Sequence, residues 1–394
     1  MKGWLLTIGL IWLIAVEILR VYFIMPFPGS QQSNTIDIAY FIDRNIWWLR
    51  LIGFAIVIIP LIHILKHSKV WKKVVVVVVL IFYGIVVYAF NFKFLADKMF
   101  YQPKEKLFAT LQTDTTAKTK LVVGLNINNE AKAYPIEIIG YHHQVKDTVG
   151  GQPVIVTYCT VCRTGRVYSP LIDGKMETFR LVGMDHFNAM FEDATTKSWW
   201  RQESGQAITG PLKDKKLIEV PSAQMALQDW IDLYPNTLVL QPDSNFKAKY
   251  DSLKGFDEGT IDGSLEHTDT ASWKNKSWVV GVTINNVSKA YDWNELVKKK
   301  MIEDVVADTS LLITIADNRK TFYVLNRKLN NQALNFNIDS AHLLTDQQTH
   351  SQWLPNGSCI EGELKGSKLQ AIQSYQEFWH SWKEFHPQTM KYPE

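Results

Sequence analysis

The stretch "LVVGLNINNEAKAYP", Leu121 to Pro135, decides the fold because the chain contains it twice. It returns as "WVVGVTINNVSKAYD", Trp278 to Asp292, 157 positions further along. In each copy two β-type runs flank an Asn-Asn pair, which is the pattern of two strands joined by a tight turn. Similarity at a fixed offset indicates two copies of one structural unit.

The similarity continues beyond this stretch, with small gaps. The matching positions are Ser198 and Trp200 with Ser351 and Trp353, and Trp230, Pro235 and Thr237 with Trp382, Pro387 and Thr389. Each copy ends in an amphipathic helix followed by proline, and strands outnumber helices. We therefore predict an α+β, sheet-dominated ectodomain of two tandem repeats, residues 100–245 and 246–394, without a dinucleotide-binding or Walker motif.

Three apolar runs occupy the N-terminal region. They cover about residues 3–25, 46–65 and 74–92, and Trp or Tyr stands near their ends. Each is close to the roughly 20 residues that cross a bilayer. We predict a three-helix transmembrane anchor at residues 1–95. Glu17 and Arg20, in the first run, have the spacing of an ion pair on one helix face.

The short loops set the orientation of this anchor. The loop "KHSKVWKK", between the second and third runs, has four lysines, whereas the preceding loop has Arg44 beside Asp37 and Asp43. The positive-inside rule then places the N-terminus in the cytoplasm, and the residues after about 95 in a periplasm or outside the cell. The bilayer is the expected partner of the helices. A net charge of only +3 argues against nucleic acid as a partner.

The stretch "VTYCTVCRTG", residues 156–165, holds two of the three cysteines in the chain. The second repeat has Ala316 and Arg319 at the places of Cys159 and Cys162. Residues that only the fold requires should be present in both repeats, so this loss indicates a functional pair. In an oxidising compartment such a pair can exist as a disulfide.

A hairpin precedes the cysteines. Gly150 and Gly151 stand between two β-type runs, and a two-residue hairpin turn requires positive φ. With these glycines at the turn, His142 lies opposite Cys159, or His143 does if a bulge shifts the register. An imidazolium beside a thiol lowers the thiol pKa. No helix is expected after the cysteines, which excludes a thioredoxin fold.

These residues favour an oxidoreductase acting on thiols and disulfides. In this hypothesis Cys159 attacks, Cys162 resolves and His142 tunes the thiolate. Arg163 and Arg166, with Tyr158, are the candidate substrate-binding residues. The expected partner is an extracytoplasmic redox protein.

Two alternatives remain open. The first is copper or zinc bound by Cys159, Cys162, His142, His143, Met184 and His186, which supply nitrogen and sulfur ligands. The second is a non-catalytic ectodomain that binds a ligand or partner. The third cysteine, Cys359, aligns with Ala207 and is predicted to be a buried structural thiol.

Around the cysteines the chain resembles the DUF3179 family. The motifs that carry the resemblance are Ala133 to Pro135, Asp147 to Val154, Thr157 to Gly165, Ser198 to Trp200, Gly205 to Leu212 and Trp230 to Thr237. The resemblance implies an extracytoplasmic location, and it implies redox chemistry because some members look like selenoproteins. The chain departs from the family's usual Pro-Leu between the cysteines, where it has Thr160-Val161, and it has His143 where an acid is usual.

Overall fold

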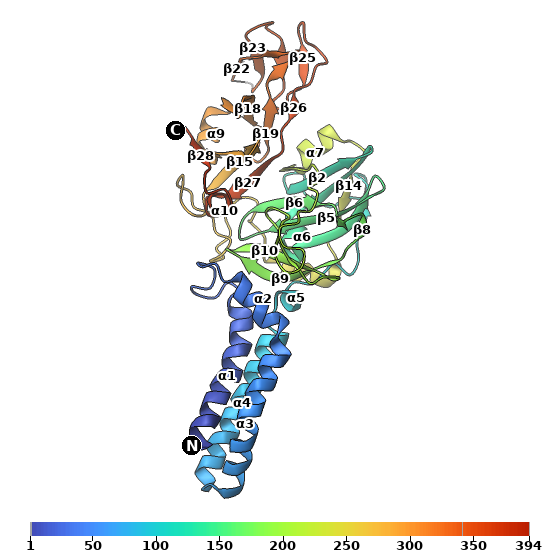
Figure 1. Cartoon of the computed structure of the whole chain (residues 1–394). Helices are drawn as coiled ribbons and strands as arrows, with labels where there is room; N and C mark the ends of the chain where they lie inside the picture. The colour runs from blue at the N-terminus through green and yellow to red at the C-terminus, as the bar shows by residue number, and fades with distance from the viewer. Residues whose placement is uncertain (1, 341, 394) are drawn as a thin grey trace. The chain divides into compact units, whose positions relative to one another are not determined.

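The computed structural model describes residues 2–340 and 342–393. The chain forms two compact units (Figure 1). Unit 1 comprises Met1–Tyr101 and Lys175–Lys216, and unit 2 comprises Gln102–Gly174 and Leu217–Glu394. The predicted α+β class, with a sheet-rich region behind three apolar helices, is confirmed.

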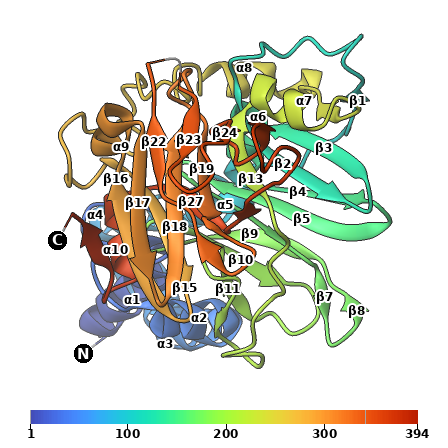
Figure 2. The same ribbon diagram turned by 90° about the horizontal axis from the view of Figure 1, so that it is seen from above.

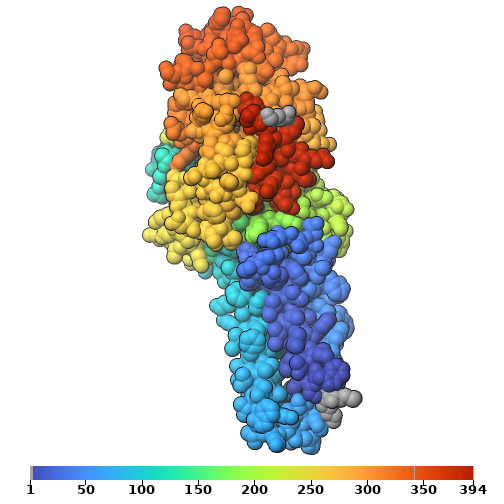
Figure 3. All heavy atoms as spheres, turned by 90° about the vertical axis from the view of Figure 1, so that its left-hand side faces the viewer, coloured from blue at the N-terminus to red at the C-terminus, as the bar shows by residue number. Residues whose placement is uncertain are grey.

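Helices dominate the first part of unit 1. They are α1 (Lys2–Tyr22), α2 (Ile36–Arg44), α3 (Ile46–His67), α4 (Val70–Phe92) and α5 (Ala96–Met99). Three segments, Gly3–Tyr22, Ile46–His67 and Val70–Phe92, are long and apolar enough to cross a membrane, as predicted. Large apolar side chains of α3 and α4 are exposed along this bundle, which is blue in Figure 3. Such a surface suits lipid rather than water.

A polar cluster joins the three long helices. Glu17 of α1 is fully buried and accepts two hydrogen bonds, at 2.6 and 2.8 Å, from Arg50 of α3. Asn91 of α4 donates to the same carboxylate at 2.8 Å. Arg20 pairs with Asp43 at 2.9 Å. The predicted Glu17–Arg20 pair is therefore wrong, because each side chain reaches a partner on another helix instead of its neighbour.

Unit 1 also contains a four-stranded sheet, in the order β12-β11-β10-β9. Its strands are β9 (Phe179–Asp185), β10 (Asn188–Asp193), β11 (Trp199–Arg201) and β12 (Ala207–Thr209), preceded by the short β8 (Lys175–Met176). The Met184 N–H donates to the Ile24 carbonyl at 2.7 Å, so the chain after α1 attaches to the β9 edge.

The first half of unit 2 denotes residues 102–174 and 217–251. Its strands are β1 (Phe108–Ala109), β2 (Leu121–Ile127), β3 (Glu130–Pro135), β4 (Gln144–Val149), β5 (Gln152–Cys159), β6 (Thr164–Tyr168), β7 (Leu171–Ile172), β13 (Ala223–Ala226) and β14 (Leu238–Leu240). Its helices are α6 (Ile136–His142), α7 (Leu227–Leu233), the 3-10 turn η1 (Ser244–Phe246) and α8 (Lys247–Asp251). The main sheets have the orders β1-β14-β3-β2-β13 and β4-β5-β6.

The second half of unit 2 denotes residues 274–393. Its strands are β15 (Trp278–Ile284), β16 (Val287–Asp292), β17 (Met301–Val306), β18 (Thr309–Ile315), β19 (Phe322–Asn326), β20 (Lys328–Leu329), β21 (Gln332–Ala333), β22 (Phe336–Ile338), β23 (Leu344–Asp346), β24 (Gln352–Trp353), β25 (Cys359–Glu361), β26 (Gln370–Ala371), β27 (Ser374–Phe378) and β28 (Met390–Tyr392). Its helices are α9 (Trp293–Lys299) and α10 (Trp379–Phe385). The larger sheets have the orders β27-β15-β16-β28, β17-β18-β19-β26 and β22-β23-β24-β25 (Figure 2).

The two copies of the opening stretch form equivalent hairpins. Strand β2 pairs with β3, and β15 with β16, in antiparallel registers that differ by the same 157 positions. Within them Gly124 and Gly281 underlie the rings of Trp230 and Trp382, where an added Cβ would lie 2.4 and 2.3 Å from ring carbons. A side chain at either glycine would displace the tryptophan that anchors α7 or α10.

Each half also places a helix against a turn of the other half. The Phe378 N–H, directly before α10, donates to the Cys162 carbonyl at 2.9 Å. In the reverse direction, the Ala226 N–H, directly before α7, donates to the Thr321 hydroxyl at 2.9 Å. The surroundings of the cysteines are therefore supplied by both halves.

The hairpin before the cysteines has the predicted register but is shorter than predicted. Gly150 and Gly151 both have positive φ, and the ladder runs from Val149↔Gln152 to Gln144↔Thr157. The predicted strand pairing of His142 with Cys159 is wrong, because His142 is the last residue of α6. His143 then has a left-handed backbone, φ 59°, that ends the helix before β4 begins.

Candidate functional site

The two cysteines lie at the closed end of a second hairpin. Strand β5 ends at Cys159, which pairs with Thr164, the first residue of β6. Cys162 lies in the four-residue loop between them, and the Arg163 N–H donates to the Thr160 carbonyl at 3.3 Å. The prediction that no helix follows the cysteines is confirmed.

Both cysteines are fully buried, and no disulfide joins them. Burial raises the pKa of the Cys162 thiol well above its usual value, and its hydrogen bond to Cys159 raises that pKa further. The thiol of Cys162 therefore keeps its proton at neutral pH.

A carboxylate and a hydroxyl from the second half of unit 2 lie beside the pair. The Ser381 hydroxyl, on α10, hydrogen-bonds the Cys162 sulfur and donates to Glu377 Oε2 at 3.1 Å. Glu377 Oε1 accepts hydrogen bonds from Thr164 at 2.8 Å and from Arg166 at 2.5 Å. Both Glu377 and Ser381 are fully buried, so this carboxylate is shielded from water.

A cation lies on the other side of the turn. Lys276 Nζ donates to the carbonyl of Val161, between the cysteines, at 2.8 Å, and His380 Nε2 lies 3.0 Å from the same oxygen. Burial lowers the pKa of Lys276, but the negative charge of either ionised cysteine opposes this shift. Burial and Lys276 together lower the pKa of His380 to about 4. The His380 imidazole is therefore uncharged at neutral pH, and Lys276 is the other basic side chain next to the turn.

The two predicted substrate-binding arginines make internal contacts. The Arg163 guanidinium donates to Gln376 Oε1 at 3.0 Å and to the Phe256 carbonyl at 2.8 Å, and it lies 3.8 Å from the ring centroid of Trp278. The Arg166 guanidinium lies 3.2 Å from the ring centroid of Tyr375. In this arrangement both arginines join the cysteine turn to the second half of unit 2 and to the segment before it.

Tyr158 and Asp257 are buried close to Arg163. Among the described residues, neither the Tyr158 hydroxyl nor Asp257 Oδ1 has a hydrogen-bond partner. Burial raises the pKa of the Tyr158 phenol above its usual value, and burial raises the pKa of Asp257 to about 6. Asp257 is thus a buried acid that changes charge near neutral pH.

The two predicted histidines are buried at the end of α6. His142 Nε2 lies 2.7 Å from the Tyr250 hydroxyl, and its ring packs against Phe246. Burial lowers the pKa of His143 to about 4. The His142 imidazole therefore belongs to an aromatic cluster formed by α6, η1 and α8. The role of either histidine toward the thiolate stays a prediction.

The two other predicted metal ligands lie in unit 1, whereas the cysteines lie in unit 2. Met184 is buried in β9, and His186 Nδ1 lies 2.7 Å from Asp185. Within residues 2–340 and 342–393, no group of three or more His, Cys, Asp or Glu side chains is arranged to hold a metal ion. Cys359 is buried in β25 and pairs with Trp353 as Ala207 pairs with Trp200, in agreement with its predicted structural role.

Sequence reasoning missed Lys276, Glu377, Ser381 and Asp257. Reactive side chains that the second copy lacks identify the cysteines but none of these four residues. Charged side chains of the second copy that the first copy lacks include Glu377, which stands where the first copy has the apolar Met225. A buried charge present in only one copy is the observation that would have identified this carboxylate.

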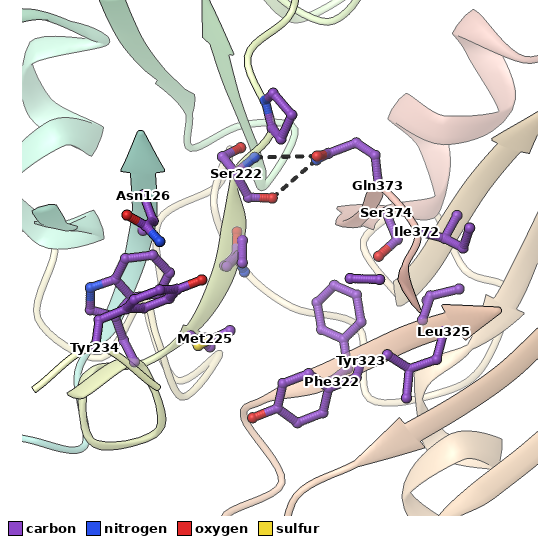
Figure 4. Close-up of a pocket in the computed structure, with 17 residues that line it drawn as sticks. Asn126, Ser222, Met225, Tyr234, Phe322, Tyr323, Leu325, Ile372, Gln373 and Ser374 are labelled. Atoms are coloured by element: carbon purple, nitrogen blue, oxygen red, sulfur yellow. Dashed lines mark hydrogen bonds between the residues drawn. The ribbon is translucent and has the colours of Figure 1, made fainter. Parts of the chain in front are cut away.

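A pocket of about 430 Å³ lies between the two halves of unit 2, and its described lining residues carry no charge (Figure 4). Tyr234 faces it from the first half, and Tyr323 faces it from the second. Trp230 also lines it. The Gln373 amide spans one end, accepting from the Ser222 N–H and donating to the Ser222 carbonyl, both at 3.2 Å. Neither cysteine lines this pocket, so it is separate from the cysteine site.

Residues 104–389 match the family described as "protein of unknown function (DUF3179)", and the chain belongs to this family. A single match covers both halves of unit 2. Together with the three apolar helices, it makes the chain a membrane-anchored DUF3179 protein.

Other comparisons add little. No curated protein sequence matches the chain. Among solved structures, the chain is similar to the quaternary ammonium Rieske monooxygenase CntA in complex with an inhibitor, at 10% identity over 77% of this chain and 80% of that chain. The TM-score of 0.16 is too low for this similarity to carry an argument.

Proposed function

We propose that this protein performs thiol–disulfide exchange outside the cytoplasm, with Cys159 and Cys162 as the redox pair. The observation that carries the proposal is the position of the two cysteines, both fully buried in one tight turn with only two residues between them. Cys159 attacks a partner's disulfide, and Cys162 then attacks Cys159 and releases the partner as a dithiol. Two electrons and two protons pass from the pair to the partner.

Two features support this assignment, and a third sets a condition on it. Lys276 is a cation close enough to interact with either thiolate, and a nearby cation favours the nucleophilic form of a cysteine. Cys162 stays protonated at neutral pH, as a resolving thiol must until the mixed disulfide has formed. Both sulfurs are buried, so the turn must open locally before a partner reaches Cys159.

In this proposal the N-terminus is cytoplasmic and unit 2 is extracytoplasmic, in accord with the lysine-rich loop between α3 and α4. The two halves of unit 2 are copies of one unit, and only the first copy carries the redox pair. The equal offset of the β2–β3 and β15–β16 registers supports this duplication.

The test is a redox titration of the full-length protein in detergent. The protein is equilibrated with mixtures of reduced and oxidised glutathione, and the cysteines are then alkylated and counted by mass spectrometry. We expect one reversible transition in which Cys159 and Cys162 change together. Persistence of both thiols across the whole range would reject the proposal. Tight binding of zinc or copper to the reduced protein, lost in Cys159→Ser, would favour the metal site instead.

A further inference from the structure

The half of unit 2 that lacks the redox cysteines has a role in the chemistry of the pair. We propose that Ser381 and Glu377 carry the proton that leaves Cys162 when the disulfide forms. This inference rests on the proposed redox function and assigns residues of the second half to it.

The need for such a route follows from burial. Cys162 is fully buried, so protein groups rather than water surround its thiol whenever the turn is closed. A thiol must lose that proton to become the nucleophile. The nearest proton acceptors are then protein groups within hydrogen-bonding distance of the sulfur.

Ser381 and Glu377 meet this requirement. The Ser381 hydroxyl hydrogen-bonds the Cys162 sulfur and donates to Glu377 Oε2 at 3.1 Å. A hydroxyl has one proton and can also accept, so it can take a proton from one neighbour while it gives its own to the other. The backbone bond from the Phe378 N–H to the Cys162 carbonyl, at 2.9 Å, holds the thiol next to this helix.

The step is balanced. The Cys162 S–H proton passes to Ser381 Oγ, while the Ser381 hydroxyl proton passes to Glu377 Oε2. The Cys162 sulfur then forms a bond to Cys159 Sγ, and the bond between Cys159 Sγ and the partner sulfur breaks. The electron pair of that bond leaves with the partner's thiolate. Ser381 touches the reacting thiol, whereas Glu377 acts through Ser381 and is a positioning residue.

The first half of unit 2 offers a matched control. There Asp229, on α7, accepts hydrogen bonds from Thr321 and from Asn318, the latter at 2.6 Å, at the turn that has no sulfur. An Asp229→Ala variant removes comparable contacts between a helix and a turn, and it leaves the cysteine turn intact.

The experiment uses the full-length Cys359→Ala protein in detergent, with the disulfide reagent 5,5′-dithiobis(2-nitrobenzoate) as the probe. Attack by Cys159 releases one coloured thiolate, and resolution by Cys162 releases a second, so the two steps are measured separately. We expect Ser381→Ala and Glu377→Gln to leave the first release unchanged and to slow the second at least tenfold, within the usual range for lost proton transfer. Asp229→Ala should slow neither.

Two outcomes separate the proposals. A second release at the parental rate in both Ser381→Ala and Glu377→Gln would overturn the proton route and leave the redox function standing. A single release, unchanged by Cys162→Ser, would instead overturn the redox function. Circular dichroism and melting temperature establish that each variant is folded. Should Glu377→Gln fail to fold, Ser381→Ala alone decides the proton route.

Discussion

Lys276 donates a hydrogen bond of 2.8 Å to the carbonyl oxygen of Val161, the backbone group between the two cysteines. The lysine lies more than 110 positions away in the sequence, directly before β15. The position of this cation near the sulfurs is therefore fixed by the contact between the two halves of unit 2.

The first prediction concerns this cation. Replacing Lys276 with methionine removes a positive charge that stabilises the thiolates, and Lys276→Arg retains it. We expect iodoacetamide to alkylate the cysteine pair about threefold to tenfold more slowly in Lys276→Met. Peptide mass spectrometry measures the rate. Lys320→Met, which removes a lysine bonded to the Thr119 carbonyl at 3.0 Å, is the control, and an equal slowing in that variant would argue against a specific role.

The second prediction concerns pH and Asp257. Burial raises the pKa of this carboxyl from 3.8 to about 6, so the folded state binds its proton more tightly than the unfolded state does. This stabilisation is complete below about pH 4 and is lost as the pH rises through about 6. Asp257→Asn should therefore raise the free energy of unfolding by up to about 3 kcal/mol at pH 7.5 and by much less at pH 4.5.

The measurement is the difference in denaturant unfolding between Asp257→Asn and the parent protein at the two pH values. A difference is needed because His143 and His380, whose pKa values burial lowers to about 4, act in the opposite direction over the same range. A stability difference that is the same at both pH values would show that Asp257 does not titrate as stated.

The third prediction concerns the glycines under the two tryptophans. An alanine at Gly281 would place its Cβ 2.3 Å from the ring of Trp382, and one at Gly124 would place it 2.4 Å from Trp230. Each substitution should destabilise unit 2 by about 1–3 kcal/mol, the usual cost of overpacking. Thermal unfolding provides the measurement. Gly84→Ala, at a position with open space around the added Cβ, should cost nothing, and an equal loss there would contradict this explanation.

The fourth prediction concerns the orientation in the membrane. A cysteine at exposed Ser264 should react with a membrane-impermeant maleimide in intact cells. A cysteine at exposed His67, the last residue of α3, should react only after the membrane is permeabilised. The reverse pattern would invert the proposed topology.

The sequence predicts local features of this molecule better than distant ones. Gly150 and Gly151 identify the hairpin turn because both require positive φ, and they set the register of β4 and β5 correctly. Helix α6 is not predictable from the sequence pattern. Six of its seven residues are buried, so it has no polar face to produce a helical periodicity. For that reason the strand was expected to continue back through His142.

In the cysteine site, too, local features could be predicted from the sequence and distant ones could not. Cys159 and Cys162 could be recognised from their spacing and from their loss in the second copy. Glu377 comes from β27, Ser381 from α10 and Lys276 from the segment before β15. All three are distant in the sequence, and no local pattern connects them to the cysteines. Their position becomes visible only when α10 and β15 lie against the cysteine turn.

Each half of unit 2 places a helix against a turn of the other half, and this has a consequence for any shortened form of the protein. A chain that ended after α8 would retain both cysteines, their hairpin and the histidines, but it would have no Glu377, Ser381 or Lys276. Its cysteine turn would face water, with Arg163 and Arg166 lacking Gln376 and Glu377. The thiols of the shorter fragment would thus lie at the surface. The second half is therefore needed for the burial and the charged surroundings of the two cysteines.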